Sequence, residues 1–321
     1  MNTLLPVGPA RADFADLDGI APLAHLGLIR ARGADAAKFL QGQLTNDVAG
    51  MALAQARLAG FCSAKGRLQA SFIVWRLADD EFLLACAASV LPATLKRLSM
   101  FVLRAQCKLS DASTELRLLG AAGASATRWI GDLPVWGTRE VDAGTLVRLP
   151  DVDGVPRCIV ALDAVQPLPD AAALGLEAWR LLDVRGAIPV IEAATADQFV
   201  PQMLNYEVVG GVDFRKGCYP GQEVVARSQY RGTIKRRMFL FECDAPASAG
   251  QEVFHSADPG QPAGMVVNAA SLPGGTGSAA LIEVKLAALE SGSLHLAAAG
   301  GAVLHRTALP YALPSEAALL A

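Results

Sequence analysis

Short apolar runs separated by tight turns set the fold class of this chain. In the first third, runs typical of β-strands lie at residues 58–62, 68–77 and 81–86. A Lys65-Gly66-Arg67 turn joins the first two, which predicts an antiparallel meander. Leu91, Leu95 and Leu98 then share one face of a helix. Residues 50–110 therefore predict an α+β unit, in which helices are mixed with antiparallel sheet.

Further short elements are expected on both sides of this unit. Their ranges are 26–31 (strand), 33–44 (helix), 101–109, 128–136 and 156–163 (strands) and 170–182 (helix). On the last helix, Trp179 points away from the face formed by Leu174 and Leu181, so it is not expected on the main core face. Beyond Arg237, closely spaced strand-like runs split by Gly, Pro and Ser predict a small C-terminal β-barrel.

Composition excludes several classes of protein. A chain of 321 residues has room for about two domains. Its net charge of -3 excludes a polycation that coats nucleic acid, and 52% hydrophobic residues exclude general disorder. No membrane span and no secretory signal are expected, because Pro and Gly break the longest uncharged run and the start lacks a basic region, so the expected location is the cytoplasm. The six cysteines lie far apart without a C-x-x-C, so no metal site is expected.

The densest cluster of charge lies at residues 215–237, which hold seven basic side chains and one acid. The bases are Arg215, Lys216, Arg227, Arg231, Lys235, Arg236 and Arg237. On a chain that is acidic overall, such a segment indicates an anionic ligand: a polycarboxylate, a phosphate or RNA. The alternative is a solvated face whose bases pair with neighbouring acids.

Within this segment, Cys218 lies in a tight turn at 216–221 that precedes a predicted helix. A helix N-terminus and the nearby Lys216 would stabilise a thiolate, so Cys218 is a candidate reactive thiol. The alternative is a small cysteine packed beneath the turn, which is the assignment for the other five cysteines. Glu223 has a structural alternative as well, as a cap of this turn.

The sequence resembles a known family at four places, in the same order. The matching segments are FLQGQLTNDV at 39–48, AGFCSAKGR at 59–67, GAIPVIEAATADQFVPQMLN at 186–205 and KGCYPGQEVVAR at 216–227. They are similar to the YgfZ family, folate-binding proteins related to the T-protein of glycine cleavage. The resemblance covers about residues 23–240, and KGCYPGQE is its most specific part. The C-terminal part agrees in general pattern only.

The resemblance implies a fold and a cofactor. It implies a folate-binding domain at 1–237, built of two ferredoxin-like α+β halves with residues 50–150 inserted, and a C-terminal β-barrel at 238–321. A central channel would bind tetrahydrofolate or a one-carbon derivative. The side chains expected at this site are Leu26, Trp179, Arg185, Lys216, Tyr219, Glu223 and Arg227. Trp179 and Leu26 match positions where relatives have tryptophans that contact folate. For Trp179 the alternative is packing against a second helix or sheet.

Two departures from the family pattern bear on activity. Ala70 and Ser71 stand where the T-protein has an Asp pair that includes its catalytic carboxylate, so aminomethyl transfer by that route is not expected. Arg185 stands where relatives often have the Glu that holds the pterin, which changes the sign of the charge there. His25 is next to Leu26 and is a further candidate to line the pocket, with an ordinary structural histidine as the alternative.

Three functions follow from these patterns. The first is a folate-binding accessory protein for iron–sulfur cluster assembly or repair, with Cys218 as its reactive thiol. Its partners would be client iron–sulfur enzymes or assembly factors, including enzymes that modify tRNA. The second is a folate-dependent aminomethyltransferase or demethylase, against which Ala70 and Ser71 count. The third is RNA binding through residues 227–237, where Tyr230 is the single aromatic available for base stacking.

Overall fold

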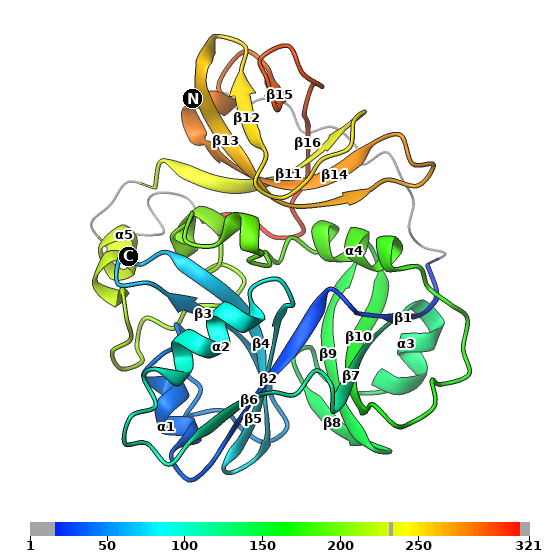
Figure 1. Cartoon of the computed structure of the whole chain (residues 1–321). Helices are drawn as coiled ribbons and strands as arrows, with labels where there is room; N and C mark the ends of the chain where they lie inside the picture. Colours follow the sequence, from blue (N-terminus) through cyan, green and yellow to red (C-terminus); the bar gives the residue numbers. More distant parts are fainter. Residues whose placement is uncertain (1–16, 231–233, 315–321) are drawn as a thin grey trace.

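The computed structural model describes residues 17–230 and 234–314. Within them the chain forms three sheets, two of five strands and one of six, in which neighbouring strands run antiparallel. Figure 1 shows the two five-stranded sheets side by side in the lower part of the molecule and the C-terminal sheet above them. The expected mixture of helices with antiparallel sheet is confirmed. The ferredoxin-like form of the two halves stays a prediction.

The first five-stranded sheet has the strand order β3-β4-β5-β2-β6. Its strands are β2 (Leu26–Arg32), β3 (Ala56–Cys62), β4 (Leu68–Ala78), β5 (Glu81–Ala87) and β6 (Lys108–Asp111). Helices α1 (Ala36–Gln41) and α2 (Leu91–Ser99) bury Phe39 and Leu98 in one core with Phe72 of β4. The predicted meander and the helix through Leu98 are confirmed, because both patterns depend on local periodicity alone.

The second five-stranded sheet has the order β1-β7-β10-β9-β8. Its elements are β1 (Gly19–Pro22), β7 (Leu116–Ala122), α3 (Gly123–Ile130), β8 (Thr138–Val141), β9 (Gly144–Val152) and β10 (Val155–Asp163). Strands β1 and β7 are paired, although the whole first sheet lies between them in the sequence. The chain therefore forms one strand of the second sheet, then the whole first sheet, and then the other four strands of the second sheet. The domain boundaries at 50–150 and at 237 stay predictions.

Two of the expected strands are wrong. Residues 128–130 end helix α3 instead, because Ala126 and Ile130 are both buried at the four-residue spacing of a helix. Residues 101–107 are irregular, and strand β6 begins only at Lys108. Leu103 in this irregular segment is 90% exposed, so its apolar character does not reflect a place in the core.

Helix α4 (Leu176–Arg185) packs against β1 on one side and against β13 and β14 of the C-terminal sheet on the other (Figure 1). It begins after Gly175 and not at Asp170. Trp179 is 1% exposed, which corrects the expectation that it lies off the core face. Sheets on both sides bury both faces of α4, so its periodicity does not distinguish a single core face. Gly120 of β7 makes room for the indole, since a Cβ there would lie 2.5 Å from the ring.

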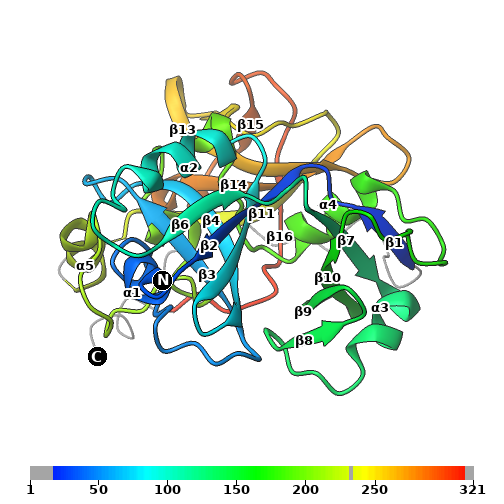
Figure 2. The same ribbon diagram turned by 60° about the horizontal axis from the view of Figure 1, so that its bottom comes forward.

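Three short helices connect α4 to the C-terminal sheet. They are η1 (Ala193–Thr195), η2 (Pro201–Leu204) and α5 (Gln222–Tyr230). The helix expected after Pro220 is confirmed by α5. Figures 1 and 2 both place α5 at the same edge of the molecule as α1.

The C-terminal sheet has the order β15-β12-β13-β14-β11-β16. Its elements are β11 (Arg236–Cys243), β12 (Glu252–His255), β13 (Asp258–Ser271), β14 (Ser278–Lys285), η3 (Leu286–Leu289), β15 (Leu294–Leu296) and β16 (His305–Thr307). Phe241, Val253 and Ile282 lie in a core of its own. The series of strands expected beyond Arg237 is confirmed, and its closure into a barrel stays a prediction.

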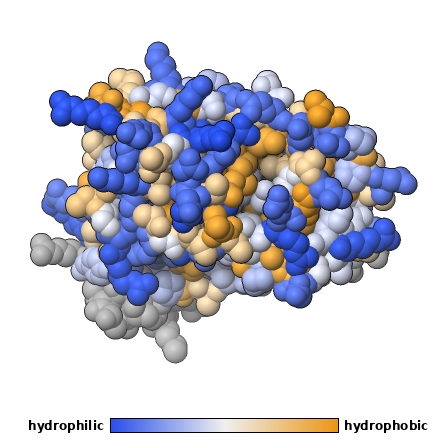
Figure 3. Space-filling model, turned by 90° about the horizontal axis from the view of Figure 1, so that it is seen from below, coloured by the Kyte–Doolittle hydropathy of each residue, from blue (hydrophilic) through white to orange (hydrophobic). Residues whose placement is uncertain are grey.

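The surface seen from below is mostly hydrophilic, with apolar side chains gathered around a hollow near its middle (Figure 3). No helix in residues 17–230 or 234–314 has the length and apolarity needed to cross a membrane.

Candidate functional site

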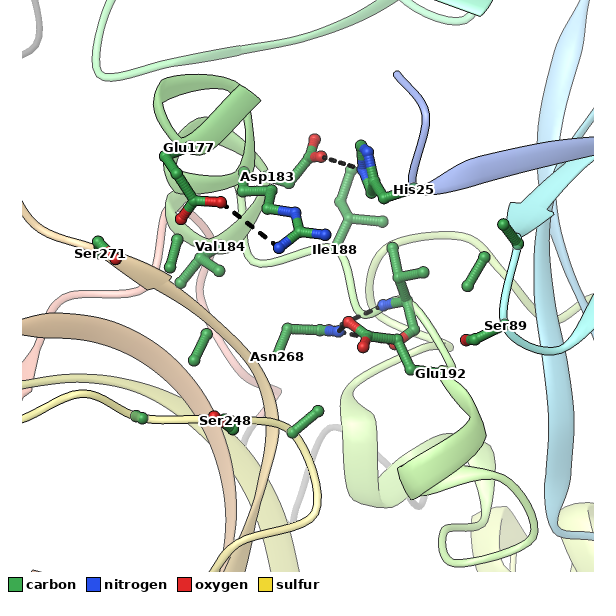
Figure 4. Close-up of a pocket in the computed structure, with 18 residues that line it drawn as sticks. His25, Ser89, Glu177, Asp183, Val184, Ile188, Glu192, Ser248, Asn268 and Ser271 are labelled. Atoms are coloured by element: carbon green, nitrogen blue, oxygen red, sulfur yellow. Dashed lines mark hydrogen bonds and ion pairs between the residues drawn. The ribbon is translucent and has the colours of Figure 1, made fainter. Parts of the chain in front are cut away.

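A cavity of about 520 Å³, here called the outer cavity, lies where α4, the start of the first sheet and the C-terminal sheet meet. Its volume is within the range of about 300–1,000 Å³ that is usual for small-molecule sites. Figure 4 shows Glu177 and Asp183 entering from α4, His25 from the chain just before β2, and Asn268 from β13. Three segments that are distant in sequence therefore contribute polar groups to one cavity.

Hydrogen bonds tie the two sides of the outer cavity together. Asn268 Nδ2 donates to Val190 O at 2.8 Å and to Glu192 Oε1 at 3.2 Å, which holds strand β13 against the loop after α4. On the α4 side, Arg180 Nη1 lies 3.5 Å from Glu177 Oε1 in a half-exposed ion pair (Figure 4). The outer cavity thus carries a positive charge from Arg180 and carboxylates both from α4 and from Glu192 in the loop after it.

Asp183 joins the outer cavity to a second, smaller one. Its Oδ1 accepts a 2.7 Å hydrogen bond from Nη1 of Arg157, whose side chain is only 2% exposed. Its Oδ2 lies 3.9 Å from Nε2 of His25. His25 lines the outer cavity, which agrees with one of the two roles that the sequence left open for it. The buried guanidinium holds Asp183 in place, so one carboxylate oxygen is fixed and the other faces His25.

The smaller cavity, here called the inner cavity, has a volume of about 50 Å³ and a largely apolar lining. Leu26 and Trp179 both line it, as do Trp136 and Tyr206. Trp179 Nε1 is buried and has no hydrogen-bond partner among the described residues. Burial raises the pKa of the Tyr206 hydroxyl, so Tyr206 stays neutral. The two positions implied to contact folate are therefore neighbours in space.

Of the two positions of the missing Asp pair, Ser71 lies at the inner cavity, whereas Ala70 lies in the core of the first sheet. Ser71 lines the inner cavity, and its Oγ accepts a 2.9 Å hydrogen bond from the backbone N–H of Ile191. Ala70 is completely buried. Neither supplies a carboxylate, and the acid that faces both cavities is Asp183. Sequence reasoning missed Asp183, although it follows Trp179 by four residues and so lies on the same side of the helix.

Arg185 is not among the described residues that line the outer or the inner cavity. It ends α4 and pairs with Asp153 at 2.5 Å and with the buried Glu242 at 3.2 Å. These contacts tie α4 to β11 and to the turn after β9. The charge reversal at Arg185 therefore leaves the acid of the cavity in place, because that acid is Asp183, two residues earlier in α4.

Lys216 has a structural position between the turn and α1. Its Nζ donates hydrogen bonds to the backbone oxygens of Gln41 and Leu44 and lies 4.9 Å from the centre of the Tyr219 ring. Burial lowers the pKa of Lys216 from 10.5 to about 8, and the nearby Asp47 partly opposes this shift. Burial also raises the pKa of the Tyr219 hydroxyl. Both side chains stabilise the turn that carries Cys218.

Cys218 is exposed, and the other five cysteines are buried as expected. Glu223 and Arg227 form an exposed ion pair of 2.9 Å along α5, so Glu223 pairs along the helix and does not cap the turn. None of Cys218, Glu223, Arg227, Lys216 and Tyr219 lines the outer or inner cavity described above. The structure therefore divides the expected site in two: Leu26 and Trp179 lie at the cavities, and the thiol lies on a separate surface.

The basic segment is largely paired with acids. Arg236 forms an ion pair with Glu283, and Arg237 forms one with Glu207 in a nearly dry environment. Arg231 lies outside the described residues. Burial raises the pKa of Glu207, whereas Arg237 opposes this shift. The pairing speaks against an anion site at these two bases, and Arg237 is buried, so it does not belong to a solvated face either.

No group of three or more His, Cys, Asp or Glu side chains is placed to hold a metal ion in the described part of the chain.

Known proteins that match this chain point to one family. The "tRNA-modifying protein YgfZ" of Edwardsiella ictaluri (strain 93-146) is 36% identical over 229 residues, which cover 66% of this chain and 67% of the relative. The chain belongs to the YgfZ family. A second relative, described only as an uncharacterized protein, is from Haemophilus influenzae (strain ATCC 51907 / DSM 11121 / KW20 / Rd). It is 29% identical over 234 residues, 72% of this chain and 76% of its own length.

The fold comparison agrees with this assignment. The GCVT N-terminal domain matches residues 18–161, which span both five-stranded sheets. The crystal structure of glycine cleavage system aminomethyltransferase T from Bartonella henselae aligns with a TM-score of 0.73 over 92% of this chain and 87% of that chain. The two are 20% identical, so this likeness shows the fold alone. The resemblance inferred from the motifs is confirmed, and the YgfZ-family chain has the fold of the aminomethyltransferase.

Proposed function

We propose that this YgfZ-family chain is a folate-binding accessory protein that supports the assembly or repair of iron–sulfur clusters, including those of enzymes that modify tRNA. One observation carries the folate part of the proposal: the outer cavity has a volume of about 520 Å³ and is lined by Asp183, which also faces the inner cavity beside Leu26 and Trp179. The tRNA part is supported by the Edwardsiella relative, which is named a tRNA-modifying protein. The iron–sulfur part rests on the resemblance of the KGCYPGQE motif.

The residues at the two cavities fit a reduced pterin ring. Such a ring carries an amino group and ring N–H groups, and Asp183 offers a carboxylate acceptor held by Arg157. At about 50 Å³ the inner cavity has room for about one or two water molecules, so the ring belongs in the outer cavity, with Asp183 at its inner wall. Arg180 offers a positive charge for the glutamate tail. The bound cofactor would supply a one-carbon unit, and this chain would bind and orient it.

The exposed Cys218 gives the accessory role a second site. Since the thiol lies outside the cavities, we expect it to act on a partner protein and not on the folate. Lys216 and Tyr219 hold the turn that presents it. Aminomethyl transfer by the T-protein route is less well supported, because Ser71 supplies no carboxylate and Asp183 is engaged by Arg157.

Calorimetric titration of the full chain with tetrahydrofolate tests the cofactor site. We expect saturable binding that Asp183→Asn weakens by about tenfold, the equivalent of one charged hydrogen bond, about 1.4 kcal/mol. Glu140→Gln, at an exposed carboxylate on β8, is the matched control and should bind as the native chain does. Absence of saturable binding to the native chain would refute folate binding.

Complementation of a deletion strain tests the thiol. Cys218→Ala should keep folate binding but lose the activity of a dependent iron–sulfur enzyme. Cys158→Ala, at a buried cysteine on β10, controls for the loss of a thiol as such. Full complementation by Cys218→Ala would remove the thiol from the mechanism and leave the folate site standing.

A further inference from the structure

The C-terminal end of α2 and the segment after it expose a cluster of large apolar side chains. Met100 is 67% exposed, Phe101 43% and Leu103 90%. They are within four positions of one another on an irregular segment between α2 and β6. Soluble proteins seldom expose large apolar side chains in contiguous groups, and such patches commonly mark interaction sites.

Unpaired positive charge surrounds this cluster. Lys96, Arg97, Arg104 and Lys108 are all exposed, and residues 96–108 contain no acid. None of the four is within ion-pair distance of an acid in the described residues, whereas the exposed Arg227 is paired. The whole chain has a net charge of -3, so this concentration of positive charge contrasts with the rest of the molecule.

The backbone holds the most exposed apolar residue in an unfavourable conformation. Leu103 has a φ of 23°, in the positive range that a branched side chain rarely adopts. A leucine with 90% of its surface in water gains nothing from burial that would offset this strain. Strained conformations tend to occur where a segment serves binding, which supports a role for this segment outside the fold.

From these observations we infer that residues 96–108 form a docking surface, here called the α2-end surface, for a partner protein segment that combines acidic with large apolar side chains. Met, Phe and Arg are enriched in protein interfaces, and complementary charge speeds and orients docking. RNA fits less well, because Phe101 is the single aromatic here and the aliphatic side chains would stay in water.

The α2-end surface and the outer cavity lie near opposite ends of helix α2. Figure 2 shows α2 and β6 side by side at the outside of the first sheet. Helix α2 starts at Leu91, two residues after Ser89, which lines the outer cavity. At 1.5 Å per residue the nine residues of α2 span about 14 Å. A small domain bound at the α2-end surface is therefore large enough to extend to the outer cavity.

Peptide display on the full chain tests this inference. Random dodecapeptides are selected on the immobilised protein, and the enriched peptides are labelled with fluorescein for anisotropy titration. We expect enrichment of Asp and Glu together with Leu, Phe or Trp, and binding that weakens as salt rises. Arg97→Glu/Leu103→Asp should weaken binding by about tenfold or more.

The matched control is Lys65→Glu/Val165→Asp, which makes the same two kinds of change at exposed positions elsewhere. It should bind the peptides as the native chain does. All four substitutions are on the surface, so unfolding midpoints should stay unchanged and tetrahydrofolate titration should be unaffected. This separates failure of the docking surface from failure of the folate site.

Four results would overturn the inference. In the first, the selection does not enrich peptides that combine acidic with apolar side chains. In the second, the control variant weakens peptide binding as much as Arg97→Glu/Leu103→Asp does. In the third, the native chain binds total tRNA or phosphatidylglycerol vesicles in place of the peptides, and Arg97→Glu/Leu103→Asp loses that binding. A native dimer in light scattering that the same double variant dissociates would assign the α2-end surface to a second copy of this chain and would overturn it too.

Discussion

Replacing Asp183 with alanine removes the counter-ion of a guanidinium that is almost completely dry. Arg157 has 1% of its surface exposed, and its Nη1 donates to Asp183 Oδ1 at 2.7 Å. Its Nε donates to Pro150 O at 3.0 Å, so the side chain keeps one hydrogen bond in the variant. In the variant, the Arg157 guanidinium stays a buried positive charge without an acid beside it, 5.8 Å from the centre of the Trp179 ring.

The expected cost follows from the burial of the two partners. Removing one member of a buried ion pair typically costs about 3–5 kcal/mol, because the other charge stays buried and uncompensated. The Asp183 side chain is 27% exposed, which places the effect at the lower end, at about 3 kcal/mol. Asp183→Asn keeps an oxygen acceptor and loses only the charge, so it should cost about 1–2 kcal/mol.

Urea unfolding followed by far-UV circular dichroism measures these differences as shifts of the transition midpoint at constant slope. The double variant Arg157→Met/Asp183→Ala should recover most of the loss, because it removes the uncompensated charge. Asp151→Ala is the control, since Asp151 forms a more exposed pair of 3.5 Å with Arg148. That control should change stability by less than about 0.5 kcal/mol.

Two results would contradict this reasoning. One is a stability of Asp183→Ala within about 0.5 kcal/mol of the native chain, which is the range of ordinary surface substitutions. The other is a double variant no more stable than Asp183→Ala. Either would mean that Arg157 is not held as a buried charge by Asp183.

Two further predictions concern packing and pH. Gly120→Ala would bring a Cβ to 2.5 Å from the Trp179 ring, so it should destabilise the fold by about 1–3 kcal/mol and shift tryptophan emission; native stability and emission in this variant would show that the indole does not pack there. Because burial lowers the pKa of Lys216 to about 8 from 10.5, the unfolded chain binds a proton that the folded chain lacks between these values. The stability of the native chain relative to Lys216→Met should therefore rise from pH about 8 to about 10 in paired urea curves, and a pH-independent difference would speak against a buried amine.

Local patterns predicted most of the elements. The strands at 58–62, 68–77 and 81–86 and the helix through Leu98 came out as expected, because residues that alternate or repeat every third or fourth position reveal which face is buried. Residues 128–130 proved helical, and Leu103 is exposed although apolar. In both cases the packing partner, or its absence, decided the outcome.

The candidate site was predicted in part. Leu26 and Trp179 line the inner cavity and His25 lines the outer one, although the helix pattern had placed Trp179 off the core face, and their contact with folate stays a prediction. Asp183 was missed because its importance comes from Arg157, a residue 26 positions away on β10. Arg185 was expected at the folate and is held by Asp153 and Glu242 instead.

The sequence by itself determined the mixed helix and sheet class and the family, since both depend on periodicity and on contiguous motifs such as KGCYPGQE. Only the tertiary structure decided which side chains share a cavity. His25, Asp183 and Asn268 come from three separate elements that meet where the sheets join. Cys218 was expected at the same site as Trp179 and yet lies outside both cavities, because burial and pairing depend on contacts made across the whole chain.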